Sequence, residues 1–269
     1  MGERVWRAVI AGLLLTYAGL TLLLALHVVP GKGYAWAPVV LSGLAAAATL
    51  LHAAAQMGWR RTLAFFLLTF GISLALETVG VVTGWVYGGY HYTSKLGWRF
   101  LGVVPIIIPL AWFMMVYPGW VIARGIVQPR ASRGSTRLKD ALAIAALGGL
   151  ILTAWDLLMD PLMVHLGYWV WEEPGAYFGI PVRNFIGWWV TVALIHLLHE
   201  IVIRPPKITP RGPAPACWAV LLYGLVGLSN LTAVLAIQNA HLQGPALAGL
   251  FAMLPWALWG WKAWRSISS

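Results

Sequence analysis

The sequence is poor in charged residues and in cysteine. Only 10% of its 269 residues are charged, whereas about 25% is usual in a soluble domain. Hydrophobic residues make up 60% of the chain, in runs too long and too numerous for one soluble core. The single cysteine, Cys217, excludes a disulfide framework and a multi-cysteine zinc site. The chain is therefore expected to be a polytopic membrane protein.

Eight apolar runs have the length that a membrane-spanning helix needs, about 20 residues for a hydrocarbon core about 30 Å thick. A helix satisfies its backbone hydrogen bonds within the lipid. The sequence therefore predicts an all-α helical bundle in one integral membrane domain, residues 1–269. No small-residue cleavage site follows the first run, so we expect a retained helix rather than a signal peptide. The predicted helices cover 5–28, 36–56, 62–83, 101–123, 138–159, 183–203, 215–237 and 245–264.

The basic residues alternate between the two sides of this arrangement. Of the 18 Lys and Arg residues, all but Lys32, Lys95, Arg99 and Arg183 fall on the side that holds both termini. The positive-inside rule assigns that side to the cytoplasm. The net charge of +10 is thus spread over short loops rather than gathered in a patch, so no nucleic-acid partner is expected. The linkers 124–137 and 204–215 would be cytoplasmic, and the aromatic loops 84–100 and 160–182 would face outward.

The two outward loops follow one pattern. In each, a carboxyl residue is followed seven residues later by glycine, then by aromatic residues, then by glycine and proline, with tryptophan seven residues after the proline. The Gly-to-Pro spacing differs, so the alignment needs a gap. We interpret the pattern as an internal repeat that relates helices 3–4 to helices 5–6 by an axis along the membrane normal. The copies contain Glu77, Gly84, Gly102, Pro105 and Trp112, and Asp160, Gly167, Gly179, Pro181 and Trp188.

Glu77 is an ionisable residue inside an apolar helix. A charge at the bilayer centre costs roughly 2.5–3.5 kcal/mol on insertion scales, so such a residue usually faces the protein interior or a cavity. Glu77 is therefore a candidate catalytic residue. The alternative is a structural carboxyl that accepts a hydrogen bond from a Trp N–H and holds two helices together.

Asp156 and Asp160 are four residues apart and share a helix face. Both are expected in the last turn, where the helix dipole disfavours negative charge by about 0.3–1 kcal/mol. Mutual repulsion and burial add to this effect, so at least one should keep its proton near neutral pH. A general acid requires such a proton. Alternatively, Asp160 ends the helix before Pro161 and Asp156 bonds a neighbouring helix.

Two other patterns point to metal ions. The DxxxD spacing is similar to the magnesium motif of membrane prenyltransferases, but those enzymes need two such motifs facing the cytoplasm, and here there is one, facing outward. His196, His199 and Glu200 share a helix face, but they are expected at the cytoplasmic end of helix 6, away from the other carboxyls. We interpret them as a wet interfacial cluster and predict no metal site.

Aromatic side chains gather around the candidate carboxyls. Many of the 17 Trp residues are expected in interfacial belts. Those beside the carboxyls can stabilise a carbocation through their ring faces or bind a flat polyene. His91 and Asn184 add hydrogen-bonding groups that either orient a water molecule or cap a helix. The candidate substrate-binding residues are Trp85, Tyr87, Tyr90, His91, Tyr92, Trp155, Trp169, Trp171, Asn184 and Trp188.

At these motifs the chain resembles a family of membrane proteins of carotenoid biosynthesis. This family includes the CruF-type carotenoid 1′,2′-hydratases and the bisanhydrobacterioruberin hydratases. The resemblance covers roughly residues 70–190; beyond them only the hydropathy is similar. Tyr87 departs from the family pattern, where phenylalanine is expected. The segments that carry the resemblance are ETVGVVTGWVYGGYHY, LGVVP, WDLLMDP and YWVWEEPGAYFGIPVRNFIGW.

The resemblance implies hydration of the terminal C1′=C2′ double bond of an acyclic carotenoid end, like that of γ-carotene or lycopene. Asp156 or Asp160 would donate the proton, and Glu77, with His91 or Asn184, would position the water. No cofactor is expected. The resemblance places the protein in the cytoplasmic membrane of a bacterium or archaeon, in contact with lipid, with other carotenoid-pathway enzymes as potential partners. The alternatives are a carotenoid-binding transporter or scaffold, and a metal-dependent lipid-modifying enzyme built on the His196 cluster.

Overall fold

The computed structural model describes residues 2–26, 37–128, 136–208 and 214–266. Within them, eight helices are long and apolar enough to cross a membrane, which confirms the predicted all-α polytopic bundle. Part of the first predicted run, 27–28, and the start of the second lie outside the described residues. The helices are α1 (Glu3–Ala25), α2 (Ala37–Met57), α3 (Trp59–Thr83), α4 (Ile107–Val127), α5 (Arg137–His165), α6 (Val182–Leu198), α7 (Cys217–Ile237) and α8 (Gln243–Ser266).

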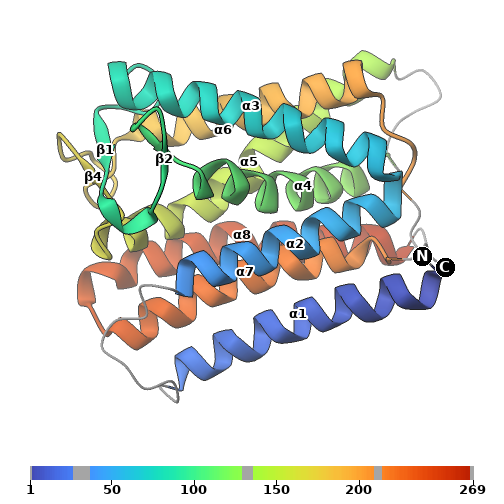
Figure 1. Ribbon diagram of the computed structural model, residues 1–269, viewed down its shortest axis with the longest axis horizontal. Coiled ribbons are helices and arrows are strands. Elements are labelled where there is room, and N and C mark those ends of the chain that lie inside the picture. Colours follow the sequence, from blue (N-terminus) through green and yellow to red (C-terminus); the bar gives the residue numbers. More distant parts are fainter. Residues whose placement is uncertain (1, 27–36, 129–135, 209–213, 267–269) are drawn as a thin grey trace.

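The helices run side by side, with α4 and α5 at the centre of the bundle (Figure 1). α5 packs most extensively on α6 and also contacts α4 and α8. Both chain ends lie at one end of the bundle. The short strands lie at the other end: β1 (Tyr90–Tyr92) pairs with β4 (Trp169–Trp171), and β2 (Arg99–Phe100) pairs with β3 (Val104–Pro105), both antiparallel. Thus β1 and β4 join the two predicted repeats at the end away from the termini.

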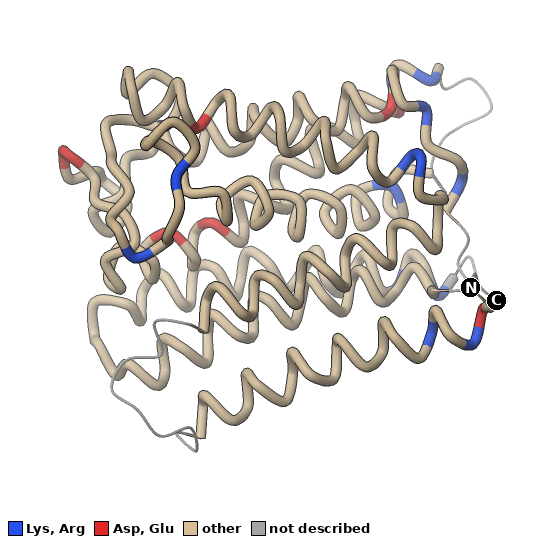
Figure 2. The backbone as a smooth tube through the Cα atoms, in the orientation of Figure 1, with Lys and Arg blue, Asp and Glu red and all other residues tan. Residues whose placement is uncertain are grey.

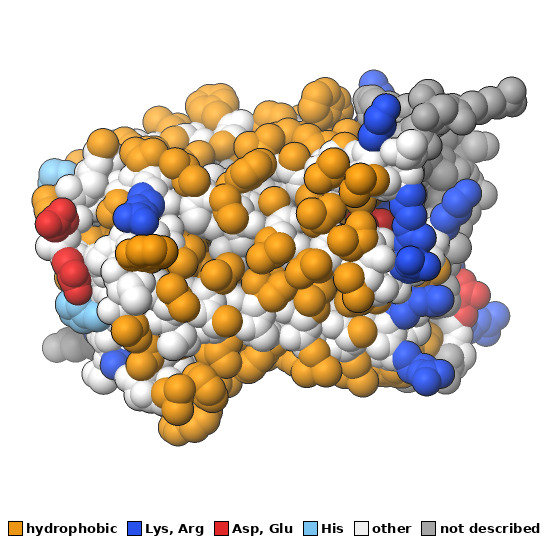
Figure 3. Space-filling model, turned by 90° about the horizontal axis from the view of Figure 1, so that it is seen from above, with side chains coloured by type: hydrophobic (Ala, Val, Ile, Leu, Met, Phe, Trp, Pro, Cys, Tyr) orange, Lys and Arg blue, Asp and Glu red, His pale blue; other side chains and the backbone are white. Residues whose placement is uncertain are grey.

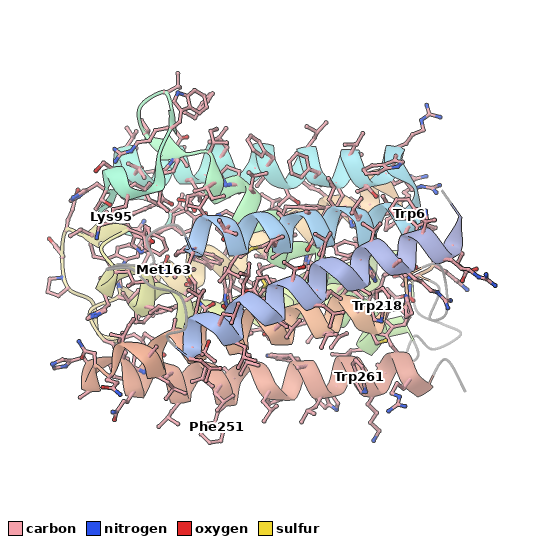
Figure 4. The ribbon with its side chains drawn as sticks, turned by 60° about the horizontal axis from the view of Figure 1, so that its bottom comes forward. Trp6, Lys95, Met163, Trp218, Phe251 and Trp261 are labelled. Carbon is pink, nitrogen blue, oxygen red and sulfur yellow. The ribbon has the colours of Figure 1, made fainter. Side chains whose placement is uncertain are left out.

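The two ends of the bundle differ in charge. Lys and Arg concentrate at the end that holds the termini (Figure 2). Hydrophobic side chains cover the flank between the ends (Figure 3). Trp6, Trp218 and Trp261 lie toward the basic end (Figure 4), where an aromatic belt is expected at a membrane interface. The positive-inside rule assigns the basic end to the cytoplasm, so the strands and their loops face outward.

The start of α4 differs from the prediction. The helix begins at Ile107 rather than at 101 because residues 99–105 form a hairpin instead. The amide of Val103 donates to the carbonyl of Phe100 across Leu101 and Gly102, which both have positive φ. Two consecutive left-handed residues are the signature of a type I′ turn.

The end of α5 also differs from the prediction. The helix does not stop before Pro161 but continues to His165, so Asp156 and Asp160 are not in its last turn and the expected dipole penalty there is reduced. Proline lacks an N–H and leaves the carbonyl four residues earlier without its helical donor. That carbonyl, on Leu157, accepts a hydrogen bond from the Tyr177 hydroxyl at 3.0 Å. Helix α5 continues through Pro161 because the loop that follows it supplies the missing donor.

Helix α4 contains the same arrangement. Pro118 leaves the carbonyl of Met114 without a helical donor, and the hydroxyl of Thr49 in α2 donates to that carbonyl at 3.1 Å. In lipid such a carbonyl has no water to bond to, so a neighbouring helix must satisfy it.

Replacing Tyr177 with phenylalanine should destabilise the protein by about 1–3 kcal/mol, because the Leu157 carbonyl is left unsatisfied. In a Pro161→Ala background the same change should cost much less, because the introduced alanine restores the helical N–H. Thermal unfolding of the two single variants and the double variant measures this coupling. An equal cost of Tyr177→Phe in both backgrounds would contradict the assignment.

The structure supports the internal repeat through corresponding turns. The second loop also has a type I′ turn, in which the Ile180 amide donates to the Tyr177 carbonyl across Phe178 and Gly179, both with positive φ. Leu101–Gly102 and Phe178–Gly179 are the positions that the sequence alignment equates. The corresponding tryptophans of the two copies stack face to face: the ring centroids of Trp112 and Trp188 are 4.0 Å apart.

Candidate active site

A cavity of about 540 Å³ lies near the outward end of the bundle. Lys95 and Met163, which both line it, lie at the opposite end from Trp6 and Trp218 (Figure 4). Its walls come from the outward halves of most of the helices and from the two outward loops, and they are mainly apolar. The candidate residues that the structure brings to this cavity are Glu77, Tyr87, Tyr90, Tyr92, Trp155, Asp156, Asp160, Trp169, Trp171, Asn184 and Trp188.

Glu77 is buried and surrounded by hydrogen-bond donors. Its Oε2 accepts from Tyr92 at 2.7 Å and from Tyr90, and its Oε1 accepts from Trp112 Nε1 at 2.9 Å. Burial, reinforced by the negative charge of Glu77, raises the pKa of Tyr90 and of Tyr92 well above the usual value. Both hydroxyls therefore stay protonated and donate. Three donors on two oxygens favour the ionised form of Glu77.

The two aspartates share one amide donor. Asn184 Nδ2 donates to Asp156 Oδ2 at 2.8 Å and to Asp160 Oδ2 at 2.7 Å. Asn184 lies in the first turn of α6, where Pro181 is the N-cap and no side chain caps the helix. Of the two roles considered for Asn184, helix capping is therefore excluded, and the residue instead links α6 to both carboxyls of α5.

The second oxygens of the two aspartates have different surroundings. Asp160 Oδ1 accepts from Trp169 Nε1 at 2.7 Å and more weakly from Trp171 Nε1 at 3.4 Å. Asp156 Oδ1 is buried and has no hydrogen-bond partner among the described residues. Asp160 thus accepts three hydrogen bonds, whereas Asp156, which also lines the cavity, accepts one and keeps an oxygen unpartnered among the described residues.

Tryptophan rings form part of the wall beside these carboxyls. Trp188 stacks on Trp112 with an interplanar angle of 21°, and Trp155 meets Trp188 edge-on with centroids 5.9 Å apart. The Nε1 of Trp155 is buried and has no partner within the described part of the chain. Trp155, which precedes Asp156 in the chain, thus brings a ring and an unpartnered N–H to the cavity that Asp156 also lines.

Two predicted site residues, Trp85 and His91, lie away from the cavity. Trp85 follows the end of α3 and is 75% exposed. His91 is the central residue of β1, and side chains alternate across a strand. Tyr90 and Tyr92 point inward, so His91 points outward and is exposed. The sequence predicted that this aromatic loop lies beside the carboxyls, but not that Trp85 and His91 face away from the cavity.

The sequence did not identify one hydrogen-bond donor to Glu77 or the polar residues that α1 and α7 contribute to the cavity wall. Trp112 carries a hydrogen bond to Glu77, and its place in the repeat, opposite Trp188, was the available signal. The other missed residues come from α1 and α7, whose sequences were interpreted only as apolar spans. Their polar side chains on the cavity wall are Tyr17, Thr21, Ser229, Asn230 and Thr232.

The His196 cluster differs from the wet interfacial group that was expected. His196 and His199 are fully buried, and Glu200 is nearly so. Glu200 belongs to a short π-helix, His199–Ile203. Its carboxylate accepts a hydrogen bond from Trp120 Nε1 at 2.8 Å and forms an ion pair with Arg124 at 3.4 Å. Residues 2–26, 37–128, 136–208 and 214–266 contain no group of three or more His, Cys, Asp or Glu side chains that could hold a metal ion.

Comparison with known proteins identifies the family. Residues 36–255, most of the chain, match the family described as carotenoid biosynthesis protein. A bisanhydrobacterioruberin hydratase from Haloarcula japonica is 34% identical over 128 residues, which is 48% of this chain and 41% of that relative. The chain thus matches less than half of the length of this curated relative. No solved structure matches the chain. The chain belongs to the carotenoid biosynthesis protein family.

Proposed function

We propose that the protein is a carotenoid hydratase. It adds water to the terminal C1′=C2′ double bond of an acyclic end, such as that of γ-carotene or lycopene. The observation that carries the proposal is the buried Asp156–Asn184–Asp160 group, with one carboxyl oxygen unpartnered among the described residues, beside a mainly apolar cavity lined in part by tryptophan. Family membership and the name of the Haloarcula relative support the reaction class.

Asp156 is the proton donor in this proposal. A buried carboxylate is stable only when donors surround it. Asp160 has three donors and Glu77 has three, whereas Asp156 has one. The proton therefore resides on Asp156, which lines the cavity and whose Oδ1 is unpartnered among the described residues. The different numbers of donors rank the two aspartates, which the sequence left equivalent.

The reaction begins with proton transfer from Asp156 to the less substituted carbon of the double bond. The π electrons form the new C–H bond and leave a tertiary cation on the neighbouring carbon. The ring faces of Trp155 and Trp188, together with the negative charges of Asp160 and Glu77, stabilise that cation. Water then forms the C–O bond, and the proton it releases returns to the carboxylate of Asp156. The mechanism uses side chains of the protein and consumes only water.

The size of the cavity supports binding of one substrate end at a time. A volume of about 540 Å³ is within the usual range for a single small ligand, roughly 300–1,000 Å³. A carotenoid is about as long as the hydrocarbon core is thick, about 30 Å. We therefore place the reacting end in the cavity and the rest of the polyene among lipid chains, in the cytoplasmic membrane of a bacterium or archaeon.

The test is expression in a host that accumulates lycopene or γ-carotene, followed by mass spectrometry of the extracted pigments. A gain of one water per reacted end, absent from the empty-vector host, is the expected result. Pigment that copurifies with the protein unchanged would favour the transporter or scaffold alternative and overturn the hydratase proposal.

A further inference from the structure

The hydratase proposed above consumes one water molecule per reaction, but the residues at its carboxyl groups are already engaged. Both oxygens of Glu77 accept hydrogen bonds, and the Asn184 amide is shared by the two aspartates. His91 lies outside the cavity. Trp155 Nε1 has no partner among the described residues, but one donor does not hold a buried water, which needs two to four polar partners. Other groups that hold the water must therefore lie elsewhere on the cavity wall.

A polar wall is present where α1 meets α7. Tyr17, Thr21, Ser229 and Asn230, here called the α1–α7 polar cluster, all line the cavity. Tyr17, Thr21 and Ser229 are more than nine-tenths buried. Tyr17 makes a side-chain hydrogen bond with Ser229. The hydroxyl of Thr21 has no partner among the described residues. An unpartnered hydroxyl is costly to bury in an apolar region, and a bound water molecule would satisfy that of Thr21.

The cluster lies at about the depth of the aspartates. α5 and α7 run in the same direction through the bundle, and the Tyr223 hydroxyl donates to the Ile151 carbonyl at 2.8 Å. At a rise of 1.5 Å per residue, Ser229 is about 9 Å and Asp156 about 7.5 Å beyond that contact. α1 packs on α2 and α7, on the side of the bundle away from α3 (Figure 1). The cluster and Asp156 therefore face one cavity from different sides at similar depth.

We propose that the α1–α7 polar cluster holds the water molecule that adds to the cation. A buried water needs two to four polar partners, and the cluster supplies hydroxyl and amide groups on an otherwise apolar wall. The oxygen of this water forms the C–O bond while Asp156, having given up its proton, takes one back. Acid and water thus come from separate groups, which makes the two half-reactions experimentally separable.

The experiment supplies lycopene or γ-carotene, whichever the wild type hydrates, to membranes containing the full chain in D₂O buffer. It measures alcohol formed and deuterium in the recovered alkene. A deuteron from Asp156 adds to the alkene carbon, and a cation that meets no water loses the original proton from that carbon to the carboxylate. Deuterium in the recovered alkene therefore measures proton transfer from the acid, and the alcohol formed measures the addition of water.

Thr21→Val and Ser229→Ala should each lower alcohol formation at least about tenfold, the effect of roughly one lost hydrogen bond, while labelling of the alkene persists or rises. Asp156→Asn should abolish both signals. Thr69→Val is the matched control, because Thr69 is also buried and without a partner in the described chain, but it does not line the cavity. It should leave both signals near wild type.

Two results would overturn the role of the cluster: full alcohol formation by both variants, or equal loss of alcohol and label, which indicates a structural effect. A wild type that yields neither alcohol nor label from either polyene would instead overturn the hydratase proposal, and this inference with it.

Discussion

Replacing Asp156 with asparagine is expected to lower the rate of hydration by about 10²–10⁴-fold, the usual contribution of a general acid. Asparagine has nearly the same shape, and its side-chain oxygen still accepts from Asn184, so the protein should fold normally. The substitution, however, replaces the carboxylic acid with an amide, which cannot protonate an alkene. The rate of alcohol formation in membranes with equal amounts of protein measures the effect.

Asp140→Asn is the control for this prediction. This variant makes the same Asp-to-Asn change in the same helix, but in the first turn of α5, at the other end of the bundle. The rate of hydration by the Asp140→Asn variant should stay close to that of the wild type. An Asp156→Asn variant that keeps more than a tenth of the wild-type rate would remove Asp156 from the role of proton donor and return the question to Asp160.

Replacing Glu77 with glutamine should destabilise the protein by about 1–3 kcal/mol or more, because at least one buried donor then faces an N–H₂ group instead of an oxygen. The three donors belong to the β1 loop and to α4, so their loss should also disturb the cavity wall and lower activity. Thermal unfolding in detergent measures the change. Tyr92→Phe removes only one of these bonds and should cost less than Glu77→Gln.

Glu173→Gln is the matched control for the Glu77 variant, since Glu173 is an exposed carboxylate at the same end of the molecule. Its unfolding temperature should not change. If Glu77→Gln unfolds at the wild-type temperature, the three donors do not depend on a charged acceptor, and Glu77 has no structural role in the outward end.

The donor counts explain how three neighbouring carboxyls can have different roles. Glu77 and Asp160 each accept from aromatic N–H or O–H groups on the β1–β4 loops, whereas Asp156 bonds only Asn184. The paired strands therefore supply the donors that favour two of the carboxyls as anions. Different environments commonly keep one of two neighbouring acids protonated and the other ionised, which gives them the roles of acid and base.

From the sequence alone one could predict the eight spans, their orientation and the three carboxyl residues that the structure brings to one cavity. These follow from local quantities: the length of each apolar run against the thickness of the bilayer, the side on which basic residues fall, and the rarity of charge inside a span. The aromatic character of the outward loops was also evident. None of these properties depends on which distant residues meet.

The tertiary structure decided the features that depend on contacts between different helices, strands and loops. Helix α5 continues past Pro161 because Tyr177, from the following loop, satisfies the freed carbonyl. His91 points away because β1 pairs with β4, which fixes the face that each side chain takes. The difference between Asp156 and Asp160 arises from donors on α6 and β4, whose directions sequence spacing does not specify. Hydrogen-bond partners are set by packing, so only the folded bundle distinguishes one aspartate from the other.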